Sequence, residues 1–437
     1  MRYINSTKTS LYNLFKIINI TCITVYFIWY ITPIFRAYFY GTFFNAIIIG
    51  LIGVWLLTAI LLNPKWIFQW NLHLIIVTIQ IISFIIMALL GIGGGALAYM
   101  KIGVSFWFTL YVYHFYASLG WRMVIGRIGT LVLISLFITG ITTLIGLISI
   151  PSAARMLTSS STLVEDNFML NSKNIGGFDF VYGLIIFIPT LISFMIFRRT
   201  RGKINLLKLS FLLLIILIFY ITLKSSFTIA LISLILGIVL GLISKMKPRS
   251  IILVIILSCV VYQLLPNETL GGYLNKVAYN LENPYVSERL HDIGNNLKGV
   301  QSTSSHLSNR TILYDMSFNT FIDHPITGVG PYYYVSGVGV GYHSQILDDL
   351  ARYGVFGLSF YLLFFYTFYK YINKQWKKLD FNGNLFVSLL IFLFVSFLNP
   401  TFSSQTISII VFFLLPALPD IVRYLVESSK MYDSELA

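Results

Sequence analysis

Residues 211–242 read FLLLIILIFYITLKSSFTIALISLILGIVLGL, which is two apolar blocks separated by the short polar turn Lys224-Ser-Ser-Phe227. Each block approaches the length that a helix needs to cross about 30 Å of hydrocarbon. Similar blocks recur along the 437 residues, of which 57% are hydrophobic and 11% are charged. An ordinary soluble domain is about 25% charged. The sequence therefore predicts a bundle of membrane-spanning helices rather than water-soluble domains.

Apolar blocks along the chain provide twelve candidate spans. The fourth is short and follows the glycine-rich stretch Gly91-Ile-Gly-Gly-Gly95, and the eleventh is short and stops at Pro400. Either could be a re-entrant or broken helix, which is tolerated only where protein covers the backbone. The predicted fold class is all-α, a polytopic integral membrane protein with about twelve transmembrane helices and one large extracytoplasmic loop containing short helices. The candidate spans are roughly residues 17–35, 42–62, 71–90, 104–119, 128–149, 180–197, 205–223, 226–244, 250–265, 352–371, 384–399 and 402–423.

Basic residues sit mainly in the short links between these blocks and account for the net charge of +14. With the N-terminus placed inside, the inner segments carry twenty Lys and Arg, and the short outer segments carry five. Such an excess in cytoplasmic links fixes the orientation of a membrane protein. Both termini are therefore predicted in the cytoplasm, and a nucleic-acid partner is rejected. Cys22 and Cys259 lie inside apolar blocks, which favours neither a disulfide nor a metal site.

One polar segment, roughly Asn267 to Asp349, interrupts the apolar pattern. It holds eight of the sixteen acidic residues and four of the six histidines. We therefore divide the chain into residues 1–266 with spans one to nine, residues 267–351 as a large extracytoplasmic catalytic loop, and residues 352–437 with spans ten to twelve and a cytoplasmic tail. A second outer loop, about 150–179, is Ser-rich, and we interpret it as a supporting lid or a mobile link.

Asn309-Arg310 opens the most informative stretch of the large loop. Asn309 is a plausible N-cap, apolar residues then recur near helical spacing, and Pro325 is expected to end the helix. Arg310 would lie in the first turn, where a cation opposes the helix dipole. Either it binds an anion together with the N–H groups of that turn, or it is a solvated or ion-paired structural arginine.

Residues 337–354 read GVGVGYHSQILDDLARYG and place His343 just before a helix that runs into the tenth span. The glycines allow tight turns, but no strand–turn–helix pattern or GxGxxG is present, so they do not predict a nucleotide-binding loop. A helix N-terminus favours the neutral imidazole, which can act as a base or a donor. The alternative is a capping or interfacial histidine. Asp348 suits the early part of this helix and can pair with Arg352 at i+4.

Other polar residues near the membrane carry weaker signals. A charge such as Lys224 close to hydrocarbon is costly and often functional, but its side chain could also reach the membrane surface. His114 and Gln80 are expected to make interhelical hydrogen bonds. Neither HExxH nor CxxC occurs, and the predicted helices carry no paired carboxylates, so no metal and no cofactor is predicted.

This layout resembles the O-antigen and capsule polymerases of the Wzy type and the related O-antigen ligases. The resemblance rests on an Arg that opens a helix (Asn309-Arg310), on the turn His324-Pro325-Ile-Thr-Gly-Val-Gly330, and on the run from His343 to Gly357 that reads HSQILDDLARYGVFG. The topology matches nearly the whole chain, whereas the motifs cover only about residues 310–357. Members of this family are bacterial inner-membrane proteins with one large outer loop.

The resemblance implies an inverting glycosyl transfer from an undecaprenyl-diphosphate-linked saccharide, without metal or nucleotide sugar. It implies that Arg310 binds the diphosphate and that His343 lies near the acceptor hydroxyl. Many relatives carry a further Arg in an "S-R" pair, whereas this chain has Lys224-Ser-Ser-Phe, so the second cation is Lys224 or Arg289. The further candidates for contacts with the diphosphate or the glycan are Tyr342, Gln345 and His324.

From the resemblance we expect a polymerase of surface polysaccharide in the bacterial inner membrane. Its partners would be the lipid-linked oligosaccharide, membrane lipids and, in the same pathway, a chain-length regulator and a flippase. The nearest alternative is an O-antigen ligase that transfers glycan to a lipid A–core acceptor, as part of lipopolysaccharide synthesis. An alternative of another class is a transporter or flippase of lipid-linked oligosaccharides. A transporter should show polar or broken helices in paired positions at mid-membrane depth, which the sequence does not display.

Overall fold

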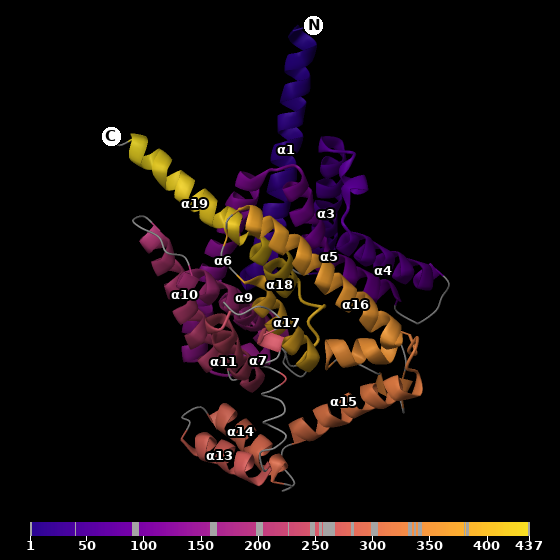
Figure 1. Cartoon of the computed structure of the whole chain (residues 1–437), viewed down its shortest axis with the longest axis vertical. Coiled ribbons are helices and arrows are strands. Elements are labelled where there is room, and N and C mark those ends of the chain that lie inside the picture. Colours follow the sequence, from indigo (N-terminus) through magenta and orange to yellow (C-terminus); the bar gives the residue numbers. More distant parts are fainter. Residues whose placement is uncertain are drawn as a thin grey trace.

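The structure is a computed structural model that describes most of the chain, and most of the described residues are helical (Figure 1). It describes residues 2–39, 41–89, 96–157, 164–197, 204–225, 227–244, 250–252, 256, 267–280, 284–298, 305–330, 334–335, 338–339, 343–379, 381 and 384–435.

The elements before the polar segment are α1 (Arg2–Ile31), α2 (Pro33–Tyr38), α3 (Thr42–Leu62), η1 (Trp66–Gln69), α4 (Leu72–Leu89), α5 (Ala96–Ser118), α6 (Arg122–Ser149), α7 (Ala153–Met156), α8 (Val164–Ser172), α9 (Phe178–Phe197), α10 (Ile204–Lys224) and α11 (Thr228–Leu242). The polar segment contains α13 (Asn267–Tyr279), α14 (Pro284–Leu297), α15 (Ser305–Asp323) and the paired strands β1 (Tyr334–Val335) and β2 (Val338–Gly339). The last part contains α16 (Gln345–Lys378), α17 (Leu385–Leu398), α18 (Gln405–Ser408), the π-helical turn η2 (Ile409–Leu414) and α19 (Leu415–Glu435).

Burial separates the central helices from those that face lipid. Every side chain in residues 180–194 of α9 and in residues 406–422 of α18, η2 and α19 is buried. In contrast, α16 exposes large apolar side chains, among them Phe356, Leu362 and Tyr366. Such a continuous apolar surface would be unfavourable in water. We infer that α9 and α18 to α19 form the centre of the bundle and that this face of α16 contacts the hydrocarbon.

Six helices are long and apolar enough to cross a membrane, judged by length and composition among the described residues. They are Ser10–Ile31, Arg122–Ser149, Phe178–Ile196, Leu207–Lys224, Gln345–Lys378 and Gln405–Glu427, and shorter apolar helices cover Ala46–Leu62, Leu72–Ser83, Thr228–Leu242 and Leu385–Leu398. The prediction of an all-α polytopic membrane protein is confirmed. The count of twelve spans and the extracytoplasmic position of the polar segment stay predictions.

Two expected spans differ in the structure. The first was expected to run to residue 35, but α1 ends at Ile31 because Pro33 has no N–H and instead starts α2. The fourth was expected to be short or broken, but α5 is a continuous helix of 23 residues that starts at Ala96. Its single Lys101 lowers the local hydropathy without breaking the helix. The eleventh is short, as expected, since α17 ends two residues before Pro400. The ninth lies mostly outside the described residues.

The two termini lie at the same end of the molecule, and α13, α14 and α15 lie at the opposite end (Figure 1). The α13–α14 pair rests on the bundle where Leu231 of α11 packs against Ala278 and Leu290. Within the pair, Asn275 donates to Asn295 at 2.9 Å. The polar segment is therefore a set of ordered helices that cover one end of the apolar bundle.

Candidate functional site

The N-terminus of α16 is held by side chains and by the end of α17. Ser344 is the N-cap: its side-chain oxygen accepts the Leu347 N–H at 3.1 Å and donates to the Phe397 carbonyl at 2.6 Å. The Gln345 N–H donates to the Asn399 carbonyl at 3.2 Å. Serine is a preferred N-cap because it satisfies an N–H that has no partner within the helix. These bonds fix the start of α16 against α17.

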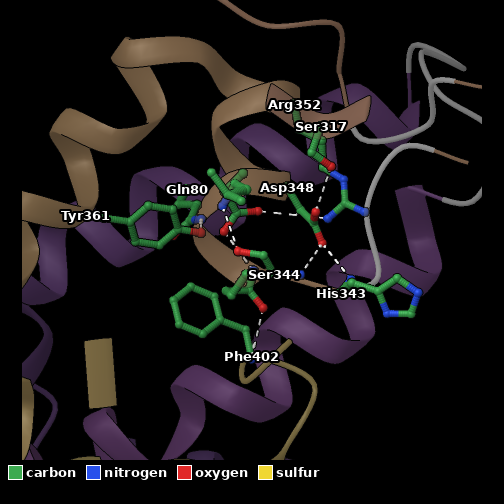
Figure 2. A network of polar contacts seen from close by, with 11 residues as sticks. Gln80, Ser317, His343, Ser344, Asp348, Arg352, Tyr361 and Phe402 are labelled. Atoms are coloured by element: carbon green, nitrogen blue, oxygen red, sulfur yellow. Dashed lines mark hydrogen bonds and ion pairs between the residues drawn. The ribbon is translucent and has the colours of Figure 1, made fainter. Parts of the chain in front are cut away.

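Asp348 uses both of its carboxylate oxygens to join three parts of the chain (Figure 2). Oδ2 accepts the backbone N–H groups of His343 at 3.1 Å and Ser344 at 3.2 Å, and Oδ1 accepts the Ser317 hydroxyl of α15 at 3.0 Å. The carboxylate is buried, and the Arg352 charge lies near it. Asp348 therefore fixes the backbone of His343 and ties α15 to α16.

Asp349 lies on the other side of the same turn of α16 and is also buried. Its Oδ2 accepts a hydrogen bond from Gln345 Nε2 at 2.7 Å, and Arg352 Nη1 lies 3.9 Å from its Oδ1. Tyr361 lies near Asp349, and Gln80 of α4 donates to the Tyr361 hydroxyl at 3.2 Å. The two carboxylates share one nearby guanidinium, and this network extends from α15 through α16 to α4 (Figure 2).

The turn from His324 to Gly330 fits into a break in α16. Gly354 has φ 62° and ψ −163°, which interrupts the helix. The N–H groups of Val355 and Phe356 therefore donate to the Pro325 and Ile326 carbonyls, at 2.8 and 3.2 Å, rather than to their helical partners. In return, the carbonyls at positions 351 and 352 accept the N–H groups of residues 329 and 330, at 3.1 and 2.9 Å. These bonds satisfy two N–H groups and two carbonyls that the break frees.

Two glycines, one in the 324–330 turn and one in α16, make this backbone contact possible. A Cβ on Gly354 would meet the Ile326 carbonyl, and a Cβ on Gly328 would meet the Arg352 carbonyl. Both residues also have positive φ, 62° and 65°, which side chains rarely adopt. We call this paired arrangement of the 324–330 turn and the break in α16 the clasp.

His343 lies directly before α16, as predicted. It is half-buried, and its imidazole points away from the Asp348 carboxylate (Figure 2). The Asp348 carboxylate binds its backbone N–H, so the network sets the point from which the ring projects. A fixed, half-buried imidazole at a helix N-terminus suits a proton-transfer or hydrogen-bonding role.

Arg310 lies in α15, but the prediction that it sits in the first turn is wrong. The helix starts at Ser305, so Asn309 is not its N-cap and Arg310 is the sixth helical residue. Residues 305–308 contain no glycine or proline, so the helix extends one turn further upstream than the capping signal suggested. The other end is confirmed, because α15 stops at Asp323, before Pro325. The Arg310 side chain lies outside the described residues.

The remaining predicted site residues fall at three places. Lys224 is the exposed last residue of α10, and Arg289 lies in α14 with its side chain outside the described part. Since α14 packs on Leu231 at the start of α11, the structure brings these two segments to the same end of the bundle. His324 is exposed in the clasp. Tyr342 lies outside the described residues.

Gln345 differs from the other substrate-binding candidates because both ends of its amide are occupied. Nε2 donates to Asp349, and Oε1 accepts the Phe402 N–H at 3.1 Å. Its role in the structure is therefore to position Asp349 and the 399–404 loop.

The prediction that Asp348 pairs with Arg352 at i+4 also changes. Among the described residues, the carboxylate within 4 Å of the Arg352 guanidinium belongs to Asp349 at i+3, because Asp348 binds backbone N–H groups.

Sequence reasoning missed the part that Ser317, Asp349 and Tyr361 take in this network. The capping-box signal is Ser or Thr followed three residues later by Glu or Gln, whereas Asp348 lies four residues after Ser344, so this pattern did not indicate its role. Nothing local to Ser317 or Tyr361 indicates their partners, which lie more than ten residues away in sequence.

The fold and this network together define a polytopic α-helical membrane protein whose polar helical segment is joined to the start of a membrane helix. Residues 209–362 match the family model described as O-antigen ligase. The predicted resemblance is thereby confirmed for this part of the chain. The match extends from α10 through the polar segment to the middle of α16. No curated protein matches the chain.

Proposed function

We propose that this protein is a glycosyltransferase that polymerises a bacterial surface polysaccharide. It would transfer a growing glycan from undecaprenyl diphosphate to a sugar hydroxyl of another lipid-linked repeat unit, without a metal ion. The observation that carries the proposal is the family match, since residues 209–362 contain Lys224, Arg289, Arg310, His343 and the carboxylates that fix His343.

In the proposed reaction the bond between the sugar anomeric carbon and the diphosphate oxygen breaks, and the acceptor hydroxyl oxygen bonds to that carbon. The hydroxyl proton passes to His343, and the diphosphate leaves with the electron pair of the broken bond. A base within reach of the acceptor commonly contributes about 10²–10⁴-fold in rate. Arg310, with Lys224 or Arg289 as the second cation, would stabilise the negative charge on the leaving group.

The proposed location is the bacterial inner membrane, with both termini in the cytoplasm and the polar segment outside. In this orientation the lipid-linked donor reaches the site sideways from the outer leaflet. The charge asymmetry of the links supports this arrangement, as does the position of α13 to α15 opposite the termini (Figure 1).

The proposal is tested with purified protein in lipid vesicles that contain a lipid-linked repeat unit. A ladder of lipid-linked oligomers, formed without any lipid A–core, supports a polymerase. Transfer that occurs only after lipid A–core is added would show the ligase alternative. Movement of the donor across the bilayer with no new glycosidic bond would show a transporter.

A further inference from the structure

A cavity of about 480 Å³ lies between α2 and α8, outside the network around α16. The last turn of α1 at Ile31 leads into α2, and α2 packs against α8. We call this cavity the α2–α8 pocket. It is lined by Arg36, Ala37, Glu165, Asn167, Phe168 and Asn171, with Val164 at its edge.

The walls of the α2–α8 pocket are tied to the bundle through Asn174, directly after α8. Its Oδ1 accepts the Ile34 N–H of α2 at 3.3 Å, and its Nδ2 donates to the Thr142 hydroxyl of α6 at 3.0 Å. Thr142 in turn donates to the Asn174 carbonyl at 2.9 Å. Asn174 has a φ of 57°, which asparagine adopts more readily than most residues. The pocket is therefore largely preformed, as small-molecule sites usually are.

The lining combines hydrogen-bond donors, acceptors and an aromatic ring. Asn167 and Asn171 each offer a donor and an acceptor, Glu165 offers acceptors, and Arg36 offers donors. Phe168 is 43% exposed, and its ring meets Tyr38 edge to face with centroids 5.6 Å apart. The Nε of Arg36 is buried with no hydrogen-bond partner among the described residues. The pocket therefore offers both polarities of hydrogen bond next to an apolar face.

These groups match a sugar ring better than a simple anion. A sugar ring carries hydroxyls, which donate and accept, and an apolar face of C–H groups that packs on an aromatic ring. Glu165 would repel a free anion. The charge of Arg36 also lies close to that of Asp179, so it is partly balanced before any ligand binds.

We propose that the α2–α8 pocket binds a sugar ring of the saccharide substrate, remote from the bond that reacts. This inference rests on the proposed function. The 399–404 loop links the two places: Ser404 lies near Asp179, which in turn lies near Arg36 of the pocket, and the Phe402 N–H donates to Gln345 at the start of α16. A remote subsite of this kind contributes to substrate affinity more than to the chemical step.

The test measures binding of a lipid-free oligosaccharide, cleaved from the strain's own surface polysaccharide, to the purified full chain in detergent. Phe168→Ala and Asn171→Ala are compared with Met169→Ala, a matched control because Met169 is exposed on α8 and does not line the pocket. We expect affinity about tenfold lower in the first two variants, which corresponds to about 1.4 kcal/mol. Met169→Ala should bind as the wild type does.

The same variants are then assayed for glycan transfer. A role in binding predicts a raised KM with kcat unchanged, whereas a damaged fold would lower kcat and the protein level together. Wild-type affinity and KM in both Phe168→Ala and Asn171→Ala would overturn the proposal, as would no oligosaccharide binding by the wild type. Displacement of the sugar by inorganic phosphate would also overturn it, because that result indicates an anion site.

Different results would contradict the pocket assignment and the proposed function. If the wild type forms glycan ladders and the two pocket variants match it in affinity and KM, only the pocket assignment is wrong. If the oligosaccharide binds and Phe168→Ala weakens its binding, but no glycosidic bond forms, the pocket assignment stands and the transferase proposal is wrong.

Discussion

Asp348 and His343 show how a single carboxylate positions a neighbouring residue without touching its side chain. The carboxylate binds the backbone N–H of His343, while the imidazole points away from it (Figure 2). This separation lets the two residues be tested independently, because removal of the imidazole leaves every Asp348 hydrogen bond in place.

For His343→Ala we expect loss of about 10²–10⁴-fold in turnover, the usual range for a positioned proton-transfer group. The protein level should stay near that of the wild type, because the alanine N–H still donates to Asp348. The measurement is glycan transfer per folded molecule, with folded protein quantified by gel filtration. Near-wild-type turnover would refute the assignment of His343 as a base or donor, even though the family match would remain.

For Arg310→Lys we expect transfer to stay impaired, although the positive charge is kept. A diphosphate held by two parallel N–H groups needs the planar guanidinium, which an ammonium cannot reproduce. The KM for the lipid-linked donor and the turnover are measured together, with Arg310→Ala as the reference for complete loss. If the lysine variant restores wild-type kinetics, Arg310 supplies only a charge and the bidentate role is wrong.

Asp348→Asn should destabilise the protein, because an amide offers one acceptor oxygen where the carboxylate has two and binds three donors. A buried donor left unsatisfied costs about 1–3 kcal/mol. Thermal unfolding in detergent is the measurement, with Asp315→Asn as the control, since Asp315 is an exposed carboxylate on α15. Equal melting temperatures for the two variants would show that Asp348 does not fix the α15–α16 contact.

At the scale of elements, the clasp explains why the turn 324–330 and α16 carry glycines at matching positions. The helix break at Gly354 frees backbone groups that only a closely approaching backbone can satisfy, and Gly328 removes the Cβ that would prevent this approach. The clasp therefore holds the turn after α15 against residues 351–356 of α16, which follow the carboxylates at positions 348 and 349.

We expect Gly354→Ala to lower stability by at least about 2 kcal/mol, since a side chain at positive φ is strained and its Cβ would meet the Ile326 carbonyl. The control is Gly53→Ala in α3, where no atom lies within 4 Å of the added Cβ. Melting temperature and glycan transfer are measured for both variants. Unchanged values in Gly354→Ala would mean that the break in α16 is not required.

Local sequence signals predicted the helices of the chain more successfully than the contacts between them. The apolar blocks placed α3, α4, α9, α10 and α17 within a few residues of their observed ends, because hydropathy is a local property. Likewise, Pro325 marked the end of α15, and α16 starts just after His343, as predicted. The bond from Ser317 to Asp348 and the clasp depend on how distant segments meet, and no single segment encodes them.

At the scale of the whole molecule, two ion pairs lie near opposite ends of α16. At the end with the termini, Arg122 pairs with Asp420 at 3.2 Å and donates to Gln375 at 2.5 Å, which joins α6, α16 and α19. The network around Asp348 lies at the other end of α16. The long α16 therefore connects a buried ion pair near the termini to the candidate site near α15.

The orientation of this whole arrangement is testable with reporter fusions. Fusions after Lys203, Arg249 and Lys378 should report the cytoplasm, because twenty Lys and Arg lie in the segments on that side against five in the short segments opposite. A fusion near Ser304 should report the outside. The physical reason is that translocating a cluster of cations across the membrane is costly, so the basic links stay inside.

The fusion near Ser304 is the most informative test of orientation, because α13 to α15 lie opposite both termini (Figure 1). An outside signal there, with cytoplasmic signals at the three basic links, places His343 where a lipid-linked saccharide in the outer leaflet can reach it. A cytoplasmic signal at Ser304 would reverse the orientation and separate the candidate site from such a donor. In that case the polymerase proposal would fail even if every residue of the network were intact, because the transfer requires the saccharide and His343 on the same side of the membrane.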